Sequence, residues 1–496
     1  MLTSNRQSPK PLRGYVLILV YMFIGLAISC LVVFDPYGTT YISHLVGIKL
    51  LPFTFVLLIS IAIVVIFFLL KYLVKNIYKI LENKELLFVI FYVVGYQTNS
   101  LELGIIDFSD IVLGMYLLIA LISIFVERKE RLINTPINLL NLLLLFFVML
   151  SLVNSRVPTK TQLLYIKIIL MYFLMVNTLY SKELVIKCVK WLIIITSCSA
   201  VFAIFQEFFF VTTGTLVVGM IEKEELKRMF EGGLFRVPAL MVSYRVFAII
   251  LAIVLLLIIS LLGFPNSLVR DFKKKMFLYS ASFLISSALL LTQAKDVLLG
   301  FFVSLVFLLL FRMPRYFIHF IAVTLLLIAV ALSFLAYFPG KEETIIYIVK
   351  DVPKEERERM QLDREGIQGF VHGDYMLSGR GRGNKYTANV HGWPAHNAFI
   401  LIADEVGIFG LIIYSGMYAW ILFRLVLLNF VVKDPAYLPI VRGLLCGIIT
   451  YFIGAQFTAS YVEPFLWVLF ALTESSARIL AKKSSSFNQT RNIIIV

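Results

Sequence analysis

The sequence predicts an all-α fold, that of a polytopic integral membrane protein with about 12 to 14 transmembrane helices. Of its 496 residues, 60% are hydrophobic and only 15% are charged, whereas a soluble protein of this length needs far more polar surface. Apolar runs of about 18 to 25 residues recur along the chain, and each is long enough to cross a ~30 Å hydrocarbon core. Residues 338–407 form the longest polar stretch, which predicts a large extracytoplasmic loop carrying short helices.

About fourteen spans are expected when the apolar runs are taken in order along the chain. The first run follows a basic N-terminus. We interpret it as a retained span, because it is ~20 residues long and lacks a small-residue cleavage site. The predicted spans lie near residues 15–34, 51–71, 86–97, 110–126, 136–153, 162–180, 188–210, 245–263, 276–293, 296–311, 316–337, 408–430, 440–457 and 463–480.

The short loops between the spans predict the orientation of the chain. Lys and Arg gather in every second loop, for example in residues 127–131 and 270–275, whereas the intervening loops carry few. Because basic loops stay in the cytoplasm, both termini are expected inside, and the long loops 211–244 and 338–407 are expected outside. The same distribution explains the net charge of +15 without a nucleic-acid partner.

Ionisable residues gather in the stretch HGWPAHNAFILIADEVG, residues 391–407. His391 and His396 are rival candidates for a general base, since a neutral imidazole accepts a hydroxyl proton near neutral pH. Trp393 offers a flat aromatic face. Asn397 can orient an imidazole or a substrate hydroxyl.

The segment HNAFILIADEVGIFGLIIY, residues 396–414, is expected to be helical. His396 would lie at its start, where the positive end of the helix dipole favours the neutral imidazole. Glu405 lies nine residues further on, too far along a straight helix to pair with His396. It is either a substrate contact or a carboxylate bonded to a neighbouring backbone or basic group.

Arginines in both outer loops are candidate ligands for a phosphate. Arg380 and Arg382 lie among glycines in LSGRGRGNKY, and a guanidinium binds phosphate with two parallel hydrogen bonds. A flexible, solvated loop is the alternative for this pair. Arg236 follows a Gly-Gly, and Arg245 begins an apolar span, where it snorkels or finds a partner. Lys295 is interpreted as a hairpin charge paired with Asp296.

These stretches resemble the O-antigen ligase and O-antigen polymerase superfamily. The match lies in a His-Asn pair followed by an apolar residue, an acidic residue and Gly-x-x-Gly-Leu. It falls here on His396, Asn397, Ile400 or Leu401, Glu405, Gly407, Gly410 and Leu411. The upstream SGRG, with Arg380, resembles the Gly-Arg of the same outer loop in that family. FRVPALMVSYRVFA resembles its earlier arginine segment, which puts Arg236 at the arginine, and LTQAKDVLLG resembles its Thr-x-Ser-Arg-Gly segment.

The resemblance covers residues 185–430 and divides the chain into three parts. Residues 1–184 would be N-terminal transmembrane helices, 185–430 the catalytic core with both outer loops, and 431–496 C-terminal helices and a cytoplasmic tail. This sequence departs from the family pattern at three places. Ala239 stands where the family usually has Gly, Tyr244-Arg245 where it has Pro-Asn, and Ala294-Lys295 where it has Ser-Arg.

The resemblance implies a GT-C type glycosyltransferase of the bacterial cytoplasmic membrane, with its active site on the extracytoplasmic face. Such enzymes move a glycan from undecaprenyl pyrophosphate to a sugar hydroxyl on a second lipid-linked repeat or on a lipid A core, without metal or cofactor. His396, Arg236 and Arg380 would be catalytic, and the substrate-binding residues would be Arg382, Asn397, Trp393, His391, Arg245 and Glu405. The expected partners are the lipids of the bilayer and, as a further candidate, a chain-length regulator.

Two alternatives belong to other classes. A transporter or flippase of lipid-linked oligosaccharides would carry its charges in mid-membrane cavities, whereas here they concentrate in outer loops. A metal site would have to use residues whose spacing matches no standard ligand motif, namely His372, Asp374, His391 and His396.

Overall fold

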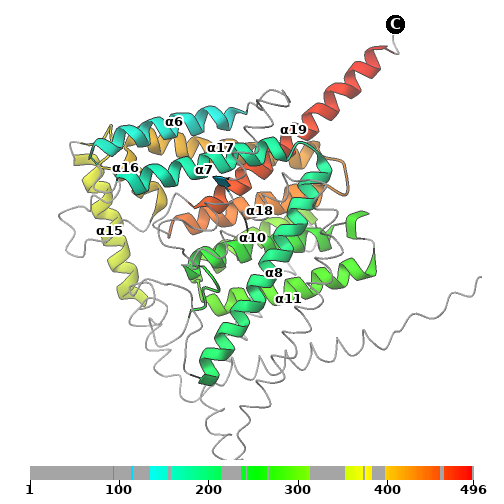
Figure 1. The fold of residues 1–496 in the computed structure, drawn as a ribbon, viewed down its shortest axis with the longest axis horizontal. Helices are drawn as coiled ribbons and strands as arrows, with labels where there is room; N and C mark the ends of the chain where they lie inside the picture. The colour runs from blue at the N-terminus through cyan, green and yellow to red at the C-terminus, as the bar shows by residue number, and fades with distance from the viewer. Residues whose placement is uncertain are drawn as a thin grey trace, which may run out of the picture. The chain divides into compact units, whose positions relative to one another are not determined.

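The structure is a computed structural model. It describes residues 93, 113–114, 135–154, 158–213, 236–241, 243–264, 267–269, 271–312, 352–372, 375–381, 397–457 and 463–493. Within these ranges all regular structure is helical (Figure 1). The α-helices are α6 (Pro136–Ser151), α7 (Pro158–Thr178), α8 (Lys182–Thr213), α10 (Tyr244–Gly263), α11 (Phe272–Thr292), α12 (Lys295–Arg312), α15 (Val352–His372), α16 (Ala398–Val406), α17 (Ile408–Val431), α18 (Leu438–Ala455) and α19 (Pro464–Ile493).

The chain divides into two compact units, and the larger one holds the segments around Arg236, Arg380 and Asn397. The first unit comprises Met1–Lys84 with Ile204–Val217, and the second comprises Glu85–Ala203 with Val218–Val496. Every described helix except the end of α8 therefore belongs to the second unit. The three-part division drawn from the family resemblance stays a prediction.

The helical membrane-protein class is confirmed by the length and composition of the helices. Among the described residues, 6 helices are long and apolar enough to cross a membrane, namely Pro136–Asn154, Lys182–Phe210, Tyr244–Gly263, Phe272–Thr292, Ile408–Val431 and Leu438–Ala455. The spans predicted near 162–180, 296–311 and 463–480 overlap α7, α12 and α19, and α19 continues beyond its predicted span to Ile493. The first two predicted spans and the one near 316–337 lie outside the described residues, as does almost all of the third and fourth, so the total of about fourteen stays a prediction.

Helix α10 is the most deeply buried of these spans. Its sequence, YRVFAIILAIVLLLIISLLG, is apolar almost all round, which is typical of a helix enclosed by others. Helix α18 packs against α10, and glycines of α18 let the backbones of these two helices approach each other closely. A Cβ on Gly443 would lie 2.7 Å from Leu257 Cδ2, and one on Gly447 would lie 2.9 Å from Ile253 Cγ2. Small residues four apart are a common device for close helix packing in membranes.

The contacts of α18 show that it runs antiparallel to both α10 and α12. Ser260, near the end of α10, donates a hydrogen bond to the carbonyl of Pro439 at the start of α18. Toward the other end of α18, a Cβ on Gly454 would lie 3.7 Å from Ile249. The carbonyl of Thr450 lies 2.9 Å from the Cβ position of Gly300, which is one turn into α12. The starts of α10 and α12 therefore lie at the same end of the bundle as the finish of α18.

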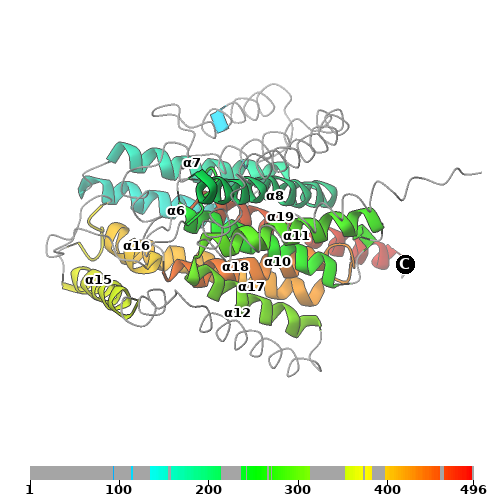
Figure 2. The same ribbon diagram turned by 90° about the horizontal axis from the view of Figure 1, so that it is seen from below.

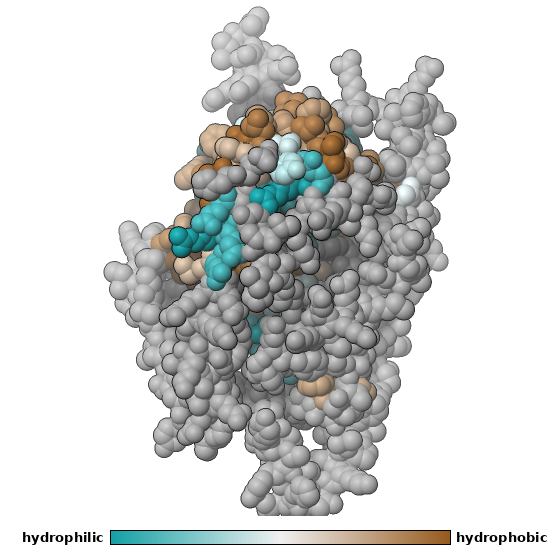
Figure 3. Space-filling view, turned by 90° about the vertical axis from the view of Figure 1, so that its left-hand side faces the viewer, coloured by the Kyte–Doolittle hydropathy of each residue, from teal (hydrophilic) through white to brown (hydrophobic). Residues whose placement is uncertain are grey.

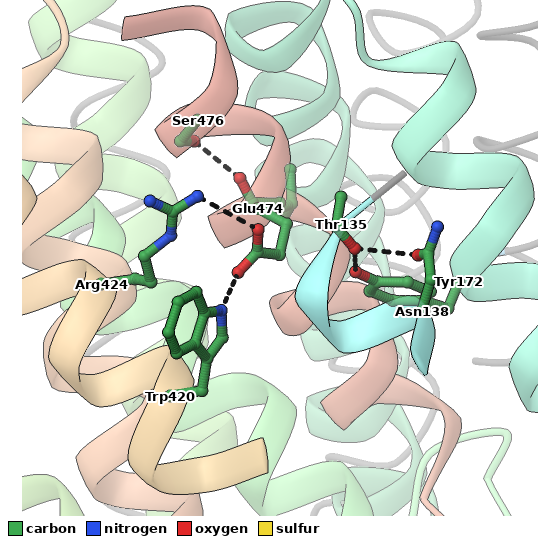
Figure 4. A network of polar contacts seen from close by, with 8 residues as sticks. Thr135, Asn138, Tyr172, Trp420, Arg424, Glu474 and Ser476 are labelled. Carbon is green, nitrogen blue, oxygen red and sulfur yellow. Dashed lines mark hydrogen bonds and ion pairs between the residues drawn. The ribbon is translucent and has the colours of Figure 1, made fainter. Parts of the chain in front are cut away.

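A polar cluster inside the bundle joins α17 to α19 (Figure 4). The Trp420 indole N–H donates to Glu474 Oε1 at 2.8 Å, and Arg424 Nη2 lies 3.6 Å from Glu474 Oε2. The side chain of Glu474 is only 1% exposed. An unpaired carboxylate inside a membrane is costly. The two contacts of Glu474 with α17 therefore fix the position of α17 against α19.

Helices α6 and α7 pack beside this cluster. The hydroxyl of Thr135, the N-cap of α6, lies 2.8 Å from the hydroxyl of Tyr172 on α7. Arg478 of α19 donates from Nη2 to the carbonyls of Val176 and Leu179 at 3.2 and 3.0 Å. A guanidinium at this place satisfies carbonyls that the end of a helix leaves without partners.

Two of the predicted elements in the long loop can be compared with the structure. The acidic and basic segment PKEERERMQLDREGIQGF forms most of α15, as predicted. The single helix expected over residues 396–414 is wrong, because it is broken at Gly407 into α16 and α17. Gly407 has a φ of 87°, in the left-handed region that interrupts a right-handed helix. Figure 2 shows α15 and α16 at one end of the bundle, opposite the C-terminus.

Candidate functional site

The segment around Arg380 is bound to the helical break by its backbone. Arg380 N–H donates to the carbonyl of Asp404 at 2.9 Å, and Gly381 N–H donates to that of Glu405 at 3.0 Å. These bonds use the last carbonyls of α16, which have no partner within their own helix. The Ser-Gly-Arg-Gly segment therefore lies along α16 as an attached strap, which is more ordered than the flexible loop of the alternative interpretation.

Glycines permit this attachment, because the two backbones nearly touch. A Cβ on Gly379 would lie 2.3 Å from the carbonyl oxygen of Glu405, and one on Gly407 would lie 2.3 Å from that of Leu377. Gly379 and Gly381 also have φ values of 71° and 78°. The expectation that these glycines adopt conformations closed to other residues is confirmed, and the close approach that they allow is to α16 and α17.

The guanidinium of Arg380 is paired with Asp404. Its Nε lies 3.3 Å from Asp404 Oδ1, and both side chains are mostly buried. Burial raises the pKa of the Asp404 carboxyl, and the charge of Arg380 partly opposes this rise. A carboxylate on the Nε side of an arginine fixes the plane of the guanidinium. Asp404 is therefore a positioning residue for Arg380, and it comes from a helix that the strap itself lies against.

Asn154, just after α6, also contacts this strap. Its side-chain nitrogen donates to the carbonyl of Gly379 at 2.9 Å. Nearby, the rings of Phe147 on α6 and Phe409 on α17 stack with their centroids 4.9 Å apart. Three helices, α6, α16 and α17, thus hold the segment that carries Arg380.

Asn397 is the N-cap of α16. Its Oδ1 accepts hydrogen bonds from the backbone N–H groups of Phe399 and Ile400 at 2.9 and 3.3 Å. Its Nδ2 donates to Gln456 Oε1, at the C-terminal end of α18, at 2.9 Å. The amide is thus engaged within the protein at both ends, which makes it a positioning group for the start of α16. Its predicted contact with substrate stays a prediction.

Arg236 and Arg245 converge on one tyrosine at the start of α10. Arg236 Nη1 donates to the hydroxyl of Tyr244 at 2.9 Å, and its guanidinium carbon lies 5.3 Å from the centre of the same ring. The guanidinium carbon of Arg245 lies 5.7 Å from that centre. Both distances fall within the range of cation–π attraction. Tyr244 therefore organises both arginines.

The Arg236 segment contacts the end of α11, so it lies next to the segment LTQAKDVLLG that precedes and begins α12. Val237 N–H donates to the carbonyl of Leu291, one residue before the end of α11. Ala239 has a φ of 54°, the left-handed conformation in which glycine is favoured. Glycine would adopt this conformation without a steric penalty, whereas alanine in it costs about 1–2 kcal/mol. Lys295 is the first residue of α12.

These segments lie at one end of the bundle, which we call the outer end. It comprises the starts of α10, α12, α16 and α17 and the finish of α18. The loop prediction places this end outside the cytoplasm. Arg236, Arg245, Arg380 and Asn397 all belong to it. Glu405 also lies here; its carbonyl accepts from Gly381, and its side chain is partly exposed.

Four predicted site residues, His391, Trp393, Arg382 and His396, lie outside the described residues, and their roles stay predictions. His396 directly precedes Asn397 in the chain, so the capped start of α16 limits where it can lie.

Sequence reasoning missed the residues that hold the arginines and Asn397 in place. Asp404 was adjacent to the expected Glu405, but nothing in the sequence indicates which of two neighbouring carboxylates meets an arginine 24 positions earlier. Gln456 and Asn154 lie at the ends of apolar spans, where polar residues are common. Only the Asn-x-x start of α16 carries a local signal, that of an N-cap.

The whole chain was compared with models of known protein families and with curated proteins. No family model matches it, and no curated protein matches it.

Proposed function

We propose that the chain is a membrane glycosyltransferase that acts at the outer end of the bundle. Its donor would be a glycan on undecaprenyl pyrophosphate, and its acceptor a sugar hydroxyl on a second lipid-linked glycan or on a lipid A core. The observation that carries this proposal is the fixed guanidinium of Arg380, held by Asp404 and by a strap bonded to α16. Arg236, held by Tyr244, supplies a second cation at the same end.

Fixed guanidinium groups suit a reaction whose leaving group is a pyrophosphate. The acceptor oxygen attacks the anomeric carbon, the bond from that carbon to the pyrophosphate oxygen breaks, and negative charge grows on the leaving group. Arg236 and Arg380 would stabilise that charge without reorganising, because protein contacts already hold them. Arg245 and Arg382 would bind the same anion less directly.

The proton of the acceptor hydroxyl needs a base, and His396 is the proposed one. A neutral imidazole accepts the proton at neutral pH as the new glycosidic bond forms. Asn397, by capping α16 and bonding Gln456, would fix the backbone that carries His396. Trp393 would stack on the acceptor sugar, and His391 is the rival base.

A transporter of lipid-linked oligosaccharides is the second candidate. The observation that favours it is the charged cluster of Arg424 and Glu474 inside the bundle, since transporters carry ionisable groups at that depth. Glu474 has partners at both oxygens, however, which also fits a purely structural ion pair. The two functions differ in their product, because only the enzyme forms a new glycosidic bond.

The test is a transfer assay with purified protein, a lipid-linked glycan donor and either acceptor. The proposal predicts longer lipid-linked glycans or a glycosylated lipid A core, in detergent as well as in vesicles. His396→Ala should abolish the product while donor binding persists, and His391→Ala should retain measurable transfer. Movement of unchanged donor across a vesicle membrane, with no new linkage, would instead support the transporter.

A further inference from the structure

Helix α15 has two different apolar faces. On one face Leu362 and Gly366 are buried against the protein. On the opposite side Met360, Ile367 and Val371 are exposed, with 70%, 48% and 52% of their surfaces accessible. At 3.6 residues per turn these three side chains fall within a sector of about 40°. An exposed apolar stripe of this kind is not needed for the packing of the helix.

The turn after α15 continues the exposed apolar surface to the start of α17. Tyr375, Met376 and Leu377 are all exposed. The carbonyl of Met376 accepts a hydrogen bond from the N–H of Ile408, the first residue of α17, at 2.9 Å. The turn is therefore fixed at the level where that helix begins.

That level is a boundary of the membrane. Ile408–Val431 is one of the helices long and apolar enough to span the bilayer, and Phe409 and Ile412 in its first turns are exposed apolar residues. Such side chains on a membrane span face lipid. Because Met376 is bonded to the first residue of this span, the turn lies at the lipid surface.

The direction of α15 also fits a membrane surface. Figure 1 shows α15 at the end of the bundle, at a steep angle to α6 and α17, and α15 packs there against α16. A helix across the ends of membrane spans lies along the plane of the membrane. Figure 3 faces the side of the molecule on which α15 and α16 lie, and apolar and polar described residues adjoin there.

We propose that α15 is an interfacial helix whose exposed stripe, Met360, Ile367 and Val371, inserts into the outer leaflet of the bilayer together with the Tyr375–Leu377 turn. An amphipathic helix in this position buries its apolar face about 5–10 Å into the boundary between headgroups and acyl chains. Arg364, which lies beside the stripe and is exposed, would extend its guanidinium to the headgroups. The helix carries basic and acidic residues in similar numbers, so apolar contact rather than attraction to anionic lipid holds it.

Spin-label accessibility in reconstituted vesicles tests this proposal. In a full-length variant without the four native cysteines, a nitroxide is attached after Ile367→Cys, Val371→Cys or Gln361→Cys. Gln361 is the matched control, since it is exposed on the same helix about 100° away from Met360. Collisions with oxygen, which concentrates in lipid, are compared with collisions with a water-soluble nickel chelate.

The proposal predicts that labels at 367 and 371 collide several-fold more often with oxygen, relative to nickel, than the label at 361, at low and at high salt. Equal preference for nickel at all three positions would overturn it, because the stripe would then face water. Protection of 367 and 371 from both reagents would overturn it as well, since another protein surface would then cover the stripe. None of these outcomes depends on glycan transfer.

Discussion

The Asn397 side chain donates a hydrogen bond to Gln456 at 2.9 Å and, with its oxygen, caps the first turn of α16. One amide therefore joins the helix that follows the proposed base to the end of α18, the span that packs on the buried α10. The position of the candidate site depends on this connection as well as on the arginine contacts.

Substitutions at Asn397 should separate its two roles. Asn397→Ala removes the cap and the bond to Gln456, and it should cost about 2 kcal/mol of unfolding free energy, roughly 1 for each. Asn397→Ser keeps a capping oxygen but is too short to reach Gln456, so it should lose about half as much. Unfolding in mixed micelles measures both. Equal losses in the two variants would show that the cap contributes nothing.

Alanine at the glycines of the strap should disrupt the outer end. Gly379→Ala combines a positive φ with a Cβ 2.3 Å from a carbonyl oxygen, so the strap must separate from α16, at a cost of at least ~3 kcal/mol. Gly416→Ala is the matched control, because nothing lies within 4 Å of its Cβ position and alanine favours a helix by about 1 kcal/mol. If thermal unfolding midpoints in detergent fall equally in both variants, the close approach of the strap is wrong.

The buried pair between α17 and α19 should be sensitive to the loss of one partner. Glu474→Ala leaves Arg424 and the Trp420 N–H without the carboxylate and should destabilise the protein by about 3–5 kcal/mol. Replacing Arg424 and Glu474 together by methionine removes both charges and should restore most of that loss. A double variant less stable than Glu474→Ala would contradict this pairing.

Asp404 should give the protein a pH dependence with a defined sign. Its pKa is raised by burial, so the folded protein holds this proton more tightly than the unfolded chain does. The resulting stability is fully present below the ordinary aspartate pKa of 3.8 and is lost as pH rises through the raised value. Relative to Asp404→Asn, the wild-type unfolding midpoint should therefore fall between acidic and neutral pH. If the unfolding midpoint of the wild type instead rises relative to that of Asp404→Asn over this range, the pKa of Asp404 is lowered in the folded protein and the predicted sign is wrong.

The spans were predictable because a long apolar run in a membrane is stable as a transmembrane helix, in which every backbone polar group is hydrogen-bonded. The predicted spans 136–153, 245–263 and 408–430 match α6, α10 and α17 to within two residues at each end. The same reasoning failed at Gly407, where hydrophobic periodicity continues through a residue whose φ reverses sign. Periodicity reports which face is buried, and it carries no information on a single dihedral angle.

Within the candidate site, residue types were predictable and their partners were not. Arg380 and Arg236 stand out in the sequence as cations among glycines and apolar residues. Their contacts with Asp404 and Tyr244 depend on how α16 and α10 are placed in three dimensions. The ion pair of Arg424 and Glu474 was missed for the same reason, since 50 residues separate the two.

The proposed role of the outer-end arginines in glycan transfer is tested most directly by the transfer rate of Arg380→Ala with purified protein and lipid-linked donor. We expect this rate to fall by roughly 10²–10³-fold, as when one fixed donor to a developing anion is removed. Arg380→Lys should recover only part of the rate, because lysine lacks the planar fork, and Gly416→Ala should transfer normally. Wild-type rates in both Arg380→Ala and Arg236→Ala, with normal folding, would contradict this role of the arginines.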